Sequence, residues 1–331
     1  VCDTIEETVD YINANGGKVG LIKVRLYRPF SAKHLIEAIP ATVKQISVLD
    51  RTKEPGALGE PLYLDVVAAL KDTQFANIPV FSGRYGLGSK DTIPADIIAV
   101  YNNTEKKLFT IGIVDDVTNL SLARTENPVT TPEGTTSCKF WGLGADGTVG
   151  ANKNSIKIIG DHTDMYAQAY FDYDSKKSGG VTISHLRFGK KPIKSTYLIN
   201  KADFVACHMP AYIRKYNMVQ DLKDGGSFLL NCSWGMEEIE KHLPGQVKRY
   251  MAEHNIKFYT IDGIKIGKEV GLGGRINTIL QAAFFKLANI IPTDEAVKYM
   301  KDAIFIIENI QYCIGRSCPK PAIYHIFFKI I

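Results

Sequence analysis

The sequence predicts an α/β protein that consists of two consecutive domains. The chain has 331 residues, which is enough to bury two separate cores. Strand-like and helix-like segments alternate up to residue 114 and again from residue 138 onward, an order typical of parallel, doubly wound sheets. The stretch between them has no hydrophobic period. Together these observations predict two α/β domains joined by a linker.

The first domain is expected over residues 1–124 and begins with a helix over Thr4–Asn15. Apolar residues recur there every three or four positions, and a Gly-Gly pair ends the helix. A strand over Val19–Leu26 follows, and Ser31 is placed to cap a helix over Ala32–Ile39. The remaining predicted elements are strands over Ile46–Leu49, Pro79–Ser82 and Leu108–Val114, and helices over Gly59–Leu70 and Ile93–Tyr101.

A linker is predicted over residues 125–137, which read TENPVTTPEGTTS and hold two prolines and five threonines. The second domain is expected over residues 138–304. Its predicted strands are Cys138–Leu143, Tyr166–Tyr173, Val181–Phe188, Ser195–Asn200, Phe204–His208 and Ser227–Cys232. Its predicted helices are Asn154–Gly160, Met236–His254 with a break at Pro244, Ile276–Ile290 and Asp294–Ile304.

The last stretch, residues 305–331, differs in character from the rest of the chain. Sixteen of its 27 residues are hydrophobic and eight are isoleucine, yet they follow neither the helical nor the strand period for long. We interpret it as an atypical apolar tail, which is either a strand-rich cap or the result of a shifted reading frame.

The composition is that of a globular protein with nearly balanced charge. Hydrophobic residues make up 45% and charged residues 23%, which excludes fibrous and disordered classes. Lys and Arg outnumber Asp and Glu by 40 to 35, but by only 37 to 34 in residues 1–304, so no nucleic-acid partner is indicated. No apolar run approaches the ~20 residues that cross a bilayer. We therefore expect no membrane partner and a cytoplasmic location.

The cysteines do not form a ligand pattern. No two are separated by the two residues typical of zinc or iron–sulfur ligands, so we predict no metal site in this chain. They are scattered through a chain too large to need disulfides, which favours a reducing compartment. The six are Cys2, Cys138, Cys207, Cys232, Cys313 and Cys318.

The strongest local motif is the glycine loop that follows the strand Cys138–Leu143. It contains Gly142, Gly144 and Gly147 in G-x-G-x-x-G spacing and precedes a helix. Glycines permit a tight turn and close approach of the backbone to phosphate oxygens, which the amides of a helix N-terminus favour. A lone motif of this kind is also compatible with a purely structural turn.

Two chemistries compete at the end of the next strand. Asp172 or Asp174 would bind a ribose hydroxyl of NAD, whereas Lys176 and Lys177 would pair with an additional phosphate, as in NADP or coenzyme A. In a doubly wound sheet this second strand is expected to end beside the glycine loop. A solvated polar turn is the plainer alternative.

The remaining candidates carry less information. His162, His185 and His208 lie far apart, which favours core or surface histidines over ligands. The sequence contains no G-x-S-x-G, H-E-x-x-H or Walker motif, so hydrolase and P-loop interpretations lack support.

Several long runs resemble pyruvate:ferredoxin (flavodoxin) oxidoreductase. They are LIKVRLYRPF, LDRTKEPGALGEPLYLDV, GLGADGTVGANKNSIKIIGDHT, YFDYDSKKSGGVTISHLRFG, NCSW and GGRINTILQAAFF. The resemblance covers Cys2–Ile304 and is to an internal part of that large enzyme. It implies a doubly wound, transketolase-C-terminal-like domain followed by a Rossmann-like domain that corresponds to the gamma subunit of the split enzymes.

The resemblance implies the reaction of the intact enzyme: pyruvate, coenzyme A and oxidised ferredoxin or flavodoxin give acetyl-CoA, carbon dioxide and the reduced carrier. It also implies thiamine diphosphate, [4Fe–4S] clusters and a homodimer in the parent enzyme, located in the cytoplasm or, in a eukaryote, in an anaerobic energy organelle. The domains that hold those cofactors lie outside the matching region. We therefore expect no catalytic residue in this chain and no activity from it alone.

What the matching region retains is the family's coenzyme A site. The resemblance implies that the loop cradles phosphate, that two lysines neutralise phosphate on the adenosine part, and that an asparagine bonds the ligand. The implied residues are Gly142, Gly144, Asp146, Gly147, Thr148, Lys176, Lys177 and Asn277. After residue 304 the apolar tail replaces a lysine-rich turn of the family. Two alternatives are a self-contained NAD(P)-dependent Rossmann oxidoreductase and a pair of non-catalytic structural or interaction domains.

Overall fold

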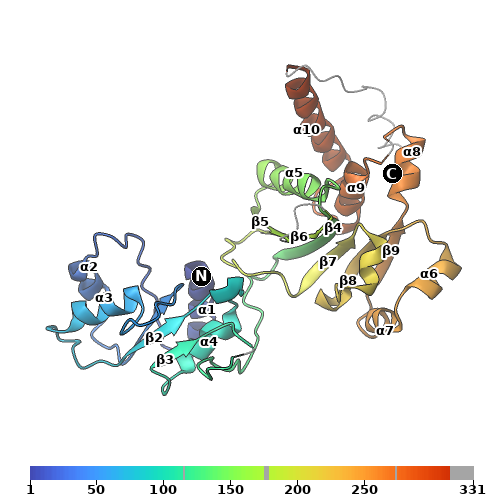
Figure 1. The fold of residues 1–331 in the computed structure, drawn as a ribbon. Helices are drawn as coiled ribbons and strands as arrows, with labels where there is room; N and C mark the ends of the chain where they lie inside the picture. The colour runs from blue at the N-terminus through green and yellow to red at the C-terminus, as the bar shows by residue number, and fades with distance from the viewer. Residues whose placement is uncertain (115, 175–178, 273, 314–331) are drawn as a thin grey trace. The chain divides into compact units, whose positions relative to one another are not determined.

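The computed structural model describes residues 1–114, 116–174, 179–272 and 274–313, and side chains up to residue 303 (Figure 1). The chain divides into two compact units. The first contains Val1–Thr131 together with the short segment Lys194–Tyr197, and the second contains the other described residues from Pro132 on. Each unit has its own sheet.

The first unit is built on a parallel sheet with strand order β1-β2-β3, in which Ile46 pairs with Val80 and Ser82 with Leu108. Its core contains Phe81, Ile97 and Phe109. The strands are β1 (Ile46–Asp50), β2 (Val80–Arg84) and β3 (Leu108–Thr110), and the helices are α1 (Cys2–Ala14), α2 (Ala32–Ala38), α3 (Pro61–Leu70), η1 (Leu87–Ser89) and α4 (Pro94–Asn102).

Most predicted elements of this unit are present, but the predicted strand Val19–Leu26 is wrong. No residue of it pairs with a strand among the described residues. The backbone of Val19 instead bonds the Asn13 side chain in both directions at 3.0 Å, and the Gly20 carbonyl accepts from the Tyr101 hydroxyl at 2.8 Å. An alternating pattern needs a neighbouring strand to become a strand.

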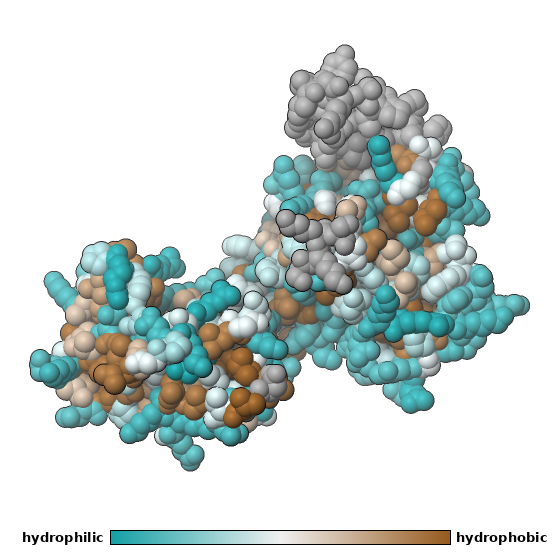
Figure 2. All heavy atoms as spheres, in the orientation of Figure 1, coloured by the Kyte–Doolittle hydropathy of each residue, from teal (hydrophilic) through white to brown (hydrophobic). Residues whose placement is uncertain are grey.

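The predicted strand Leu108–Val114 is also too long. The strand ends at Thr110, and Gly112 has a φ of +77°, which leaves the extended region. The first unit exposes large apolar side chains, including Leu26, Leu58 and Val117, and Figure 2 shows apolar residues gathered on its surface.

The second unit contains a sheet with strand order β5-β6-β4-β7-β8-β9. Strands β4, β7, β8 and β9 run parallel, and β6 lies antiparallel between β4 and β5. The strands are β4 (Thr136–Leu143), β5 (Tyr166–Tyr173), β6 (Val181–Gly189), β7 (Ala202–Cys207), β8 (Leu222–Asn231) and β9 (Lys257–Ile261).

Helices cover both faces of this sheet, which confirms the predicted α/β class. On one face α5 (Thr148–His162), α9 (Asn277–Ala288) and α10 (Thr293–Cys313) pack on a core that includes Phe140, Phe204 and Phe284. On the other face α6 (Met236–His242) and α7 (Gly245–Glu253) pack against a core that includes Phe228 and Leu230. Figure 1 shows α5 and α10 on one side of the sheet and α7 on the other.

Several boundaries differ from the prediction. The helix predicted over Asn154–Gly160 is α5, which begins directly after the glycine loop, and the predicted break at Pro244 is confirmed between α6 and α7. The predicted strand Ser195–Asn200 does not form. The elements β9, α8 (Gly263–Glu269), η2 (Pro210–Arg214) and η3 (Val219–Asp221) were not predicted.

The last described helix, α10, continues through Cys313, so the first residues of the predicted tail extend a helix. Residues 314–331 lie outside the described part of the chain. No described helix combines the length and the apolar character that a membrane span requires.

Candidate functional site

The glycine loop lies where the direction of winding of the second sheet changes. From β4 the chain first builds β5 and β6 on one side, and later returns to build β7 on the other side of β4. In open α/β sheets such a switch point creates a crevice at the carboxyl ends of the strands, where ligands bind. The loop from Gly142 to Gly147 occupies this crevice.

Two glycines of the loop are required by the local geometry. A Cβ atom on Gly142 would lie 2.4 Å from the Thr148 hydroxyl oxygen, so only glycine leaves room for the first residue of α5. Gly147 has a φ of +86°, a left-handed conformation that L-residues adopt at a cost, and a Cβ there would lie 3.1 Å from the Asn277 side chain. The loop is therefore closely fitted to Thr148 and Asn277.

Asp146 fixes the turn from within. Its carboxylate accepts hydrogen bonds from the amides of Leu143 at 2.8 Å and Thr148 at 2.7 Å, and the Gly144 amide donates to the Gly180 carbonyl at 2.8 Å. Leu143, Gly144 and Thr148 thus use their amides inside the protein. Asp146 shapes the loop, and its negative charge makes it a poor direct contact for phosphate.

Three amides at the start of α5 remain available. Gly147, Val149 and Gly150 donate no backbone hydrogen bond to the described residues. They lie at the positive end of a 15-residue helix, where the peptide dipoles and the unpaired N–H groups both favour an anion. The chemistry that this end of the loop supports is the binding of a negatively charged oxygen group.

His208 is a site residue that the sequence interpretation did not identify. Its Nδ1 lies 2.7 Å from the Thr148 hydroxyl oxygen at the end of β7. Burial lowers the pKa of His208 to about 4, although the nearby Asp146 carboxylate opposes the shift, so the ring is neutral at pH 7. The signal available in the sequence was its position at the end of the predicted strand Phe204–His208, but the sequence did not show that this strand lies beside β4.

Asn277 and Asn231 connect the loop to the rest of the crevice. Asn277, the first residue of α9, lies against Gly147, so α5 and α9 begin side by side. Asn231, at the end of β8, donates to the His208 carbonyl and accepts from the Gly263 amide, both at 3.0 Å. Its carboxamide ties together the ends of β7, β8 and β9.

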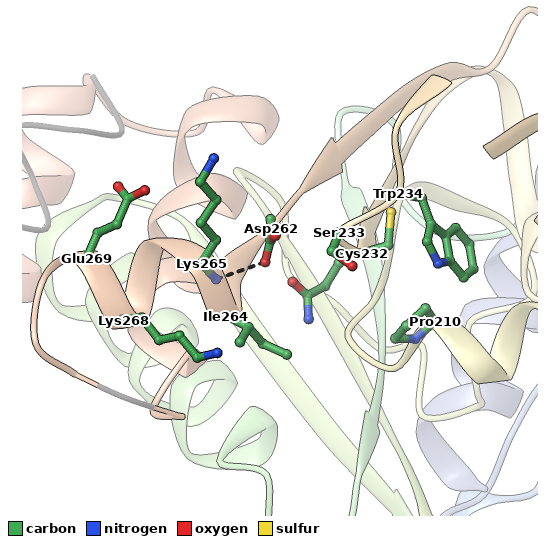
Figure 3. A pocket seen from close by; sticks show the side chains of 10 residues that line it. Pro210, Cys232, Ser233, Trp234, Asp262, Ile264, Lys265, Lys268 and Glu269 are labelled. Carbon is green, nitrogen blue, oxygen red and sulfur yellow. Dashed lines mark hydrogen bonds between the residues drawn. The ribbon is translucent and has the colours of Figure 1, made fainter. Parts of the chain in front are cut away.

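A cavity of about 490 Å³ adjoins this network at the ends of β7, β8 and β9 (Figure 3). The Trp234 ring and Lys268 lie on opposite sides of it, with Ile264 between them. Gly263 links the cavity wall to the start of α9, since a Cβ there would lie 3.4 Å from Ile276. The cavity is lined by Pro210, Asn231, Cys232, Ser233, Trp234, Asp262, Ile264, Lys265, Lys268 and Glu269.

The side chains of the cavity favour binding over covalent chemistry. The Trp234 ring is held by stacking on His242 at 4.4 Å between ring centres. Asp262 caps α8 by accepting from the Lys265 amide at 2.9 Å. Burial raises the pKa of the Cys232 thiol, so at neutral pH the thiolate, which is the nucleophilic form, is scarce.

The structure brings six of the predicted site residues together and leaves two untested. The six meet at the switch point, although Asn277 is 129 positions from Thr148 in the chain. They are Gly142, Gly144, Asp146, Gly147, Thr148 and Asn277. Lys176 and Lys177 lie outside the described residues.

The strand β5 does not pair with β4, because β6 lies between them. Asp172, at the end of β5, is therefore not placed as the ribose-binding acid of a dinucleotide fold would be. Gly180, which directly precedes β6, contacts the glycine loop, since its carbonyl accepts a hydrogen bond from the Gly144 amide. Among the described residues, no three His, Cys, Asp or Glu side chains are grouped closely enough to share a metal ion.

Comparisons with known proteins match both units. The family described as pyruvate ferredoxin/flavodoxin oxidoreductase matches residues 137–306, and the family described as pyruvate:ferredoxin oxidoreductase core domain II matches residues 1–97. A pyruvate:ferredoxin oxidoreductase from Moorella thermoacetica is 62% identical over 307 residues, and a pyruvate-flavodoxin oxidoreductase from Enterobacter agglomerans is 57% identical over 309 residues.

Each of these two relatives matches 92% of this chain, and the chain spans about a quarter, 26%, of the length of each relative. Among solved structures, a pyruvate oxidoreductase subunit from Thermotoga maritima is 16% identical with a TM-score of 0.45, covering 60% of this chain and 94% of that subunit.

Proposed function

The chain belongs to the pyruvate:ferredoxin/flavodoxin oxidoreductase family, and from this premise we propose that its second unit binds coenzyme A at the glycine loop. The observation that carries the proposal is the junction of α5 and α9. There, amides at the start of α5 that have no acceptor among the described residues lie beside the Asn277 carboxamide in the crevice. Coenzyme A carries a diphosphate and a 3′-phosphate, the groups that such an arrangement favours.

Some of the proposed site residues shape the glycine loop, and others contact the ligand. Gly142, Gly144 and Asp146 shape the loop. The Thr148 side chain fills the space over Gly142, the Gly144 amide donates to Gly180, and the Asp146 carboxylate accepts from two loop amides. Gly147 and Asn277 are the ligand contacts at the start of the two helices, and Thr148 is held in place by His208.

Lys176 and Lys177 are proposed to pair with the 3′-phosphate. The turn that carries them leads to Gly180, whose carbonyl contacts the glycine loop. Two ammonium groups near one phosphate would each contribute a charge-assisted hydrogen bond. An NAD-type role for Asp172 is disfavoured by the position of β5 at the edge of the sheet.

We propose that the chain forms middle domains of a larger enzyme. Residues 1–124 would be the domain that resembles the transketolase C-terminal domain, residues 125–137 the linker, and residues 138–304 the gamma-like domain. The parent reaction would convert pyruvate and coenzyme A to acetyl-CoA and carbon dioxide while reducing ferredoxin or flavodoxin. Thiamine diphosphate and the iron–sulfur clusters would be bound by the rest of a homodimeric, cytoplasmic enzyme, and this chain alone would be inactive.

Titration calorimetry of the chain with a series of nucleotides tests the proposal. Coenzyme A is expected to bind, dephospho-coenzyme A to bind at least about tenfold more weakly because it lacks the 3′-phosphate, and NADH and NADPH not to bind. Binding of only a nicotinamide nucleotide would favour the oxidoreductase alternative. The absence of binding by every ligand would favour the structural alternative.

The double variant Lys176→Ala with Lys177→Ala tests the two lysines separately. It should lower the affinity for coenzyme A about as much as removal of the 3′-phosphate does, and it should leave the affinity for dephospho-coenzyme A unchanged. Equal losses for both ligands would show that the lysines act elsewhere. Lys190→Ala with Lys191→Ala, a second Lys-Lys pair in the same unit, is the matched control.

A further inference from the structure

Four buried polar side chains near the glycine loop each have one atom without a hydrogen-bond partner among the described residues. They are the hydroxyls of Thr182 and Ser184 on β6 and the side-chain amide nitrogens of Asn152 on α5 and Gln281 on α9. The four side chains are between 0% and 6% exposed. Buried polar groups in proteins are nearly always paired, with the protein or with ordered water.

The strand register places the two hydroxyls directly under α5. In the pairing of β4 with β6, Thr182 lies opposite Gly142 and Ser184 opposite Phe140. Leu186, two residues further along the same face, packs in the core with Ile158 and Ile159 of α5. Thr182 and Ser184 therefore face α5, and Thr182 lies beside the space over Gly142 that Thr148 fills.

Helical spacing places each of the two amides one turn beyond a residue that contacts the glycine loop. Asn152 follows Thr148 by four residues, and Gln281 follows Asn277 by four, so each lies on the same side of its helix as a loop contact. Side chains on a helix lean toward its N-terminus, which directs both amides back toward the loop. The helices α5 and α9 pack together there.

The helix α5 and the strand β6 also run in the same direction. The helix α5 returns over the sheet from the carboxyl ends of the strands, and β6, antiparallel to β4, runs the same way. One turn of α5 from Thr148 to Asn152 covers about 6 Å. The two-residue step from Thr182 to Ser184 covers about 6.8 Å. Asn152 is thus about as far along the sheet from Thr148 as Ser184 is from Thr182.

We propose that these four groups line a buried polar chamber that holds ordered water beneath the glycine loop. The donors and acceptors match those of water: hydroxyls that both donate and accept, and amide groups that donate. Internal water typically makes about three hydrogen bonds to groups of this kind. The glycine loop then rests on hydrated polar groups rather than on apolar core.

The double variant Thr182→Val with Ser184→Ala tests the chamber, because it removes both hydroxyls with little change of shape. Long-lived internal waters are counted by oxygen-17 magnetic relaxation dispersion. The variant should lose at least one such water, and its melting temperature should fall on the order of 2–4 °C. Ser155→Ala is the matched control: Ser155 is fully buried on α5, but its hydroxyl already donates to the Ala151 carbonyl at 3.0 Å.

A dry chamber would give the opposite result. Replacing unpaired hydroxyls by apolar groups would then raise the melting temperature and leave the water count unchanged. If the double variant does not fold, a crystal structure of the unaltered chain at about 2 Å or better decides the question. Water within hydrogen-bond distance of Ser184 Oγ and Asn152 Nδ2 is expected, and an empty space there would overturn the proposal.

Discussion

Thr148 is the residue on which the geometry of the site converges. Its hydroxyl bonds His208, its side chain occupies the space that Gly142 leaves free, and its amide donates to Asp146. It therefore joins the ends of β4 and β7 to the start of α5. Sequence analysis could identify the threonine by its place after the glycine motif, but not the histidine 60 positions away that pairs with it.

Gly147→Ala tests the fit of the loop at a single residue. The φ of +86° and the Asn277 side chain 3.1 Å from the new Cβ both oppose alanine. We expect a loss of about 1–2 kcal/mol in the free energy of unfolding, measured with urea. The control is Gly150→Ala, which has nothing within 4 Å and lies within α5. It should be neutral or stabilising by up to about 1 kcal/mol, and equal losses in the two variants would contradict the assignment.

The lowered pKa of His208 leads us to expect that the stability of the chain depends on pH. Its pKa is lowered from 6.5 to about 4 in the folded chain, so between these values the unfolded chain takes up a proton that the folded chain does not. Stability should therefore fall as the pH drops from about 6.5 to about 4. At pH 5, the lowered pKa of this one residue reduces the free energy of unfolding by roughly 2 kcal/mol relative to neutral pH.

Urea unfolding of the parent chain and of His208→Gln at pH 7.5 and pH 5 measures the effect. The variant should lose less stability on acidification than the parent chain. His185, whose pKa is lowered to about 3 by burial and by nearby Lys139 and Arg187, contributes equally to both proteins and so cancels. Identical losses in both would mean that His208 is protonated in the folded chain.

At the scale of elements, the sequence predicted what local patterns determine and failed where distant partners decide. The alternation of β1, α3, β2 and α4 and the break at Pro244 follow from spacing, turn residues and proline. The strand predicted over Val19–Leu26 does not form, because no strand of the described chain lies beside it.

The insertion of β6 between β4 and β5 is a second case in which local patterns were insufficient. The strands β5 and β6 were predicted almost to the residue, but the order of the strands in the sheet depends on long-range pairing. For the same reason the site could be predicted only in part. The glycine loop is local, whereas the approach of Asn277 and His208 depends on the order of the whole sheet.

Asn231→Asp tests how the ends of the strands are joined. The Asn231 amide donates to the His208 carbonyl, and a carboxylate would place negative charge against that oxygen. We expect a loss of about 1–3 kcal/mol in the free energy of unfolding. Asn200→Asp, at an exposed position of the same unit, should change it by less than about 0.5 kcal/mol. A loss as small as this in Asn231→Asp would show that the hydrogen bond from Asn231 to the His208 carbonyl contributes little to stability.

At the scale of the whole molecule, the first unit is not continuous in sequence. The segment Lys194–Tyr197 belongs to it, although the residues on either side belong to the second unit. The Glu7 carboxylate, on α1, accepts hydrogen bonds from Ser195 at 2.5 Å and Tyr197 at 2.7 Å. A truncation at the linker would therefore remove part of the first unit.

Tyr197→Phe tests this attachment. It removes the hydroxyl that donates a hydrogen bond to the Glu7 carboxylate, and it should lower the free energy of unfolding of the first unit by about 1 kcal/mol. The unit can be followed by hydrogen exchange of α1 amides, which should become faster. Tyr166→Phe, at a half-exposed position on β5, is the control and should leave α1 unchanged. Unchanged exchange in Tyr197→Phe would show that the segment does not stabilise α1.

The proposed coenzyme A site is tested most directly by the affinity of the second unit for coenzyme A, measured by calorimetry of Asn277→Leu against the unaltered chain. Leucine keeps the approximate size of asparagine and removes its hydrogen bonds. The unaltered chain should bind coenzyme A, and the variant should bind it about tenfold more weakly with an unchanged unfolding midpoint. Equal affinities in the two proteins, or no binding by either, would contradict the placement of the ligand at the start of α5 and α9.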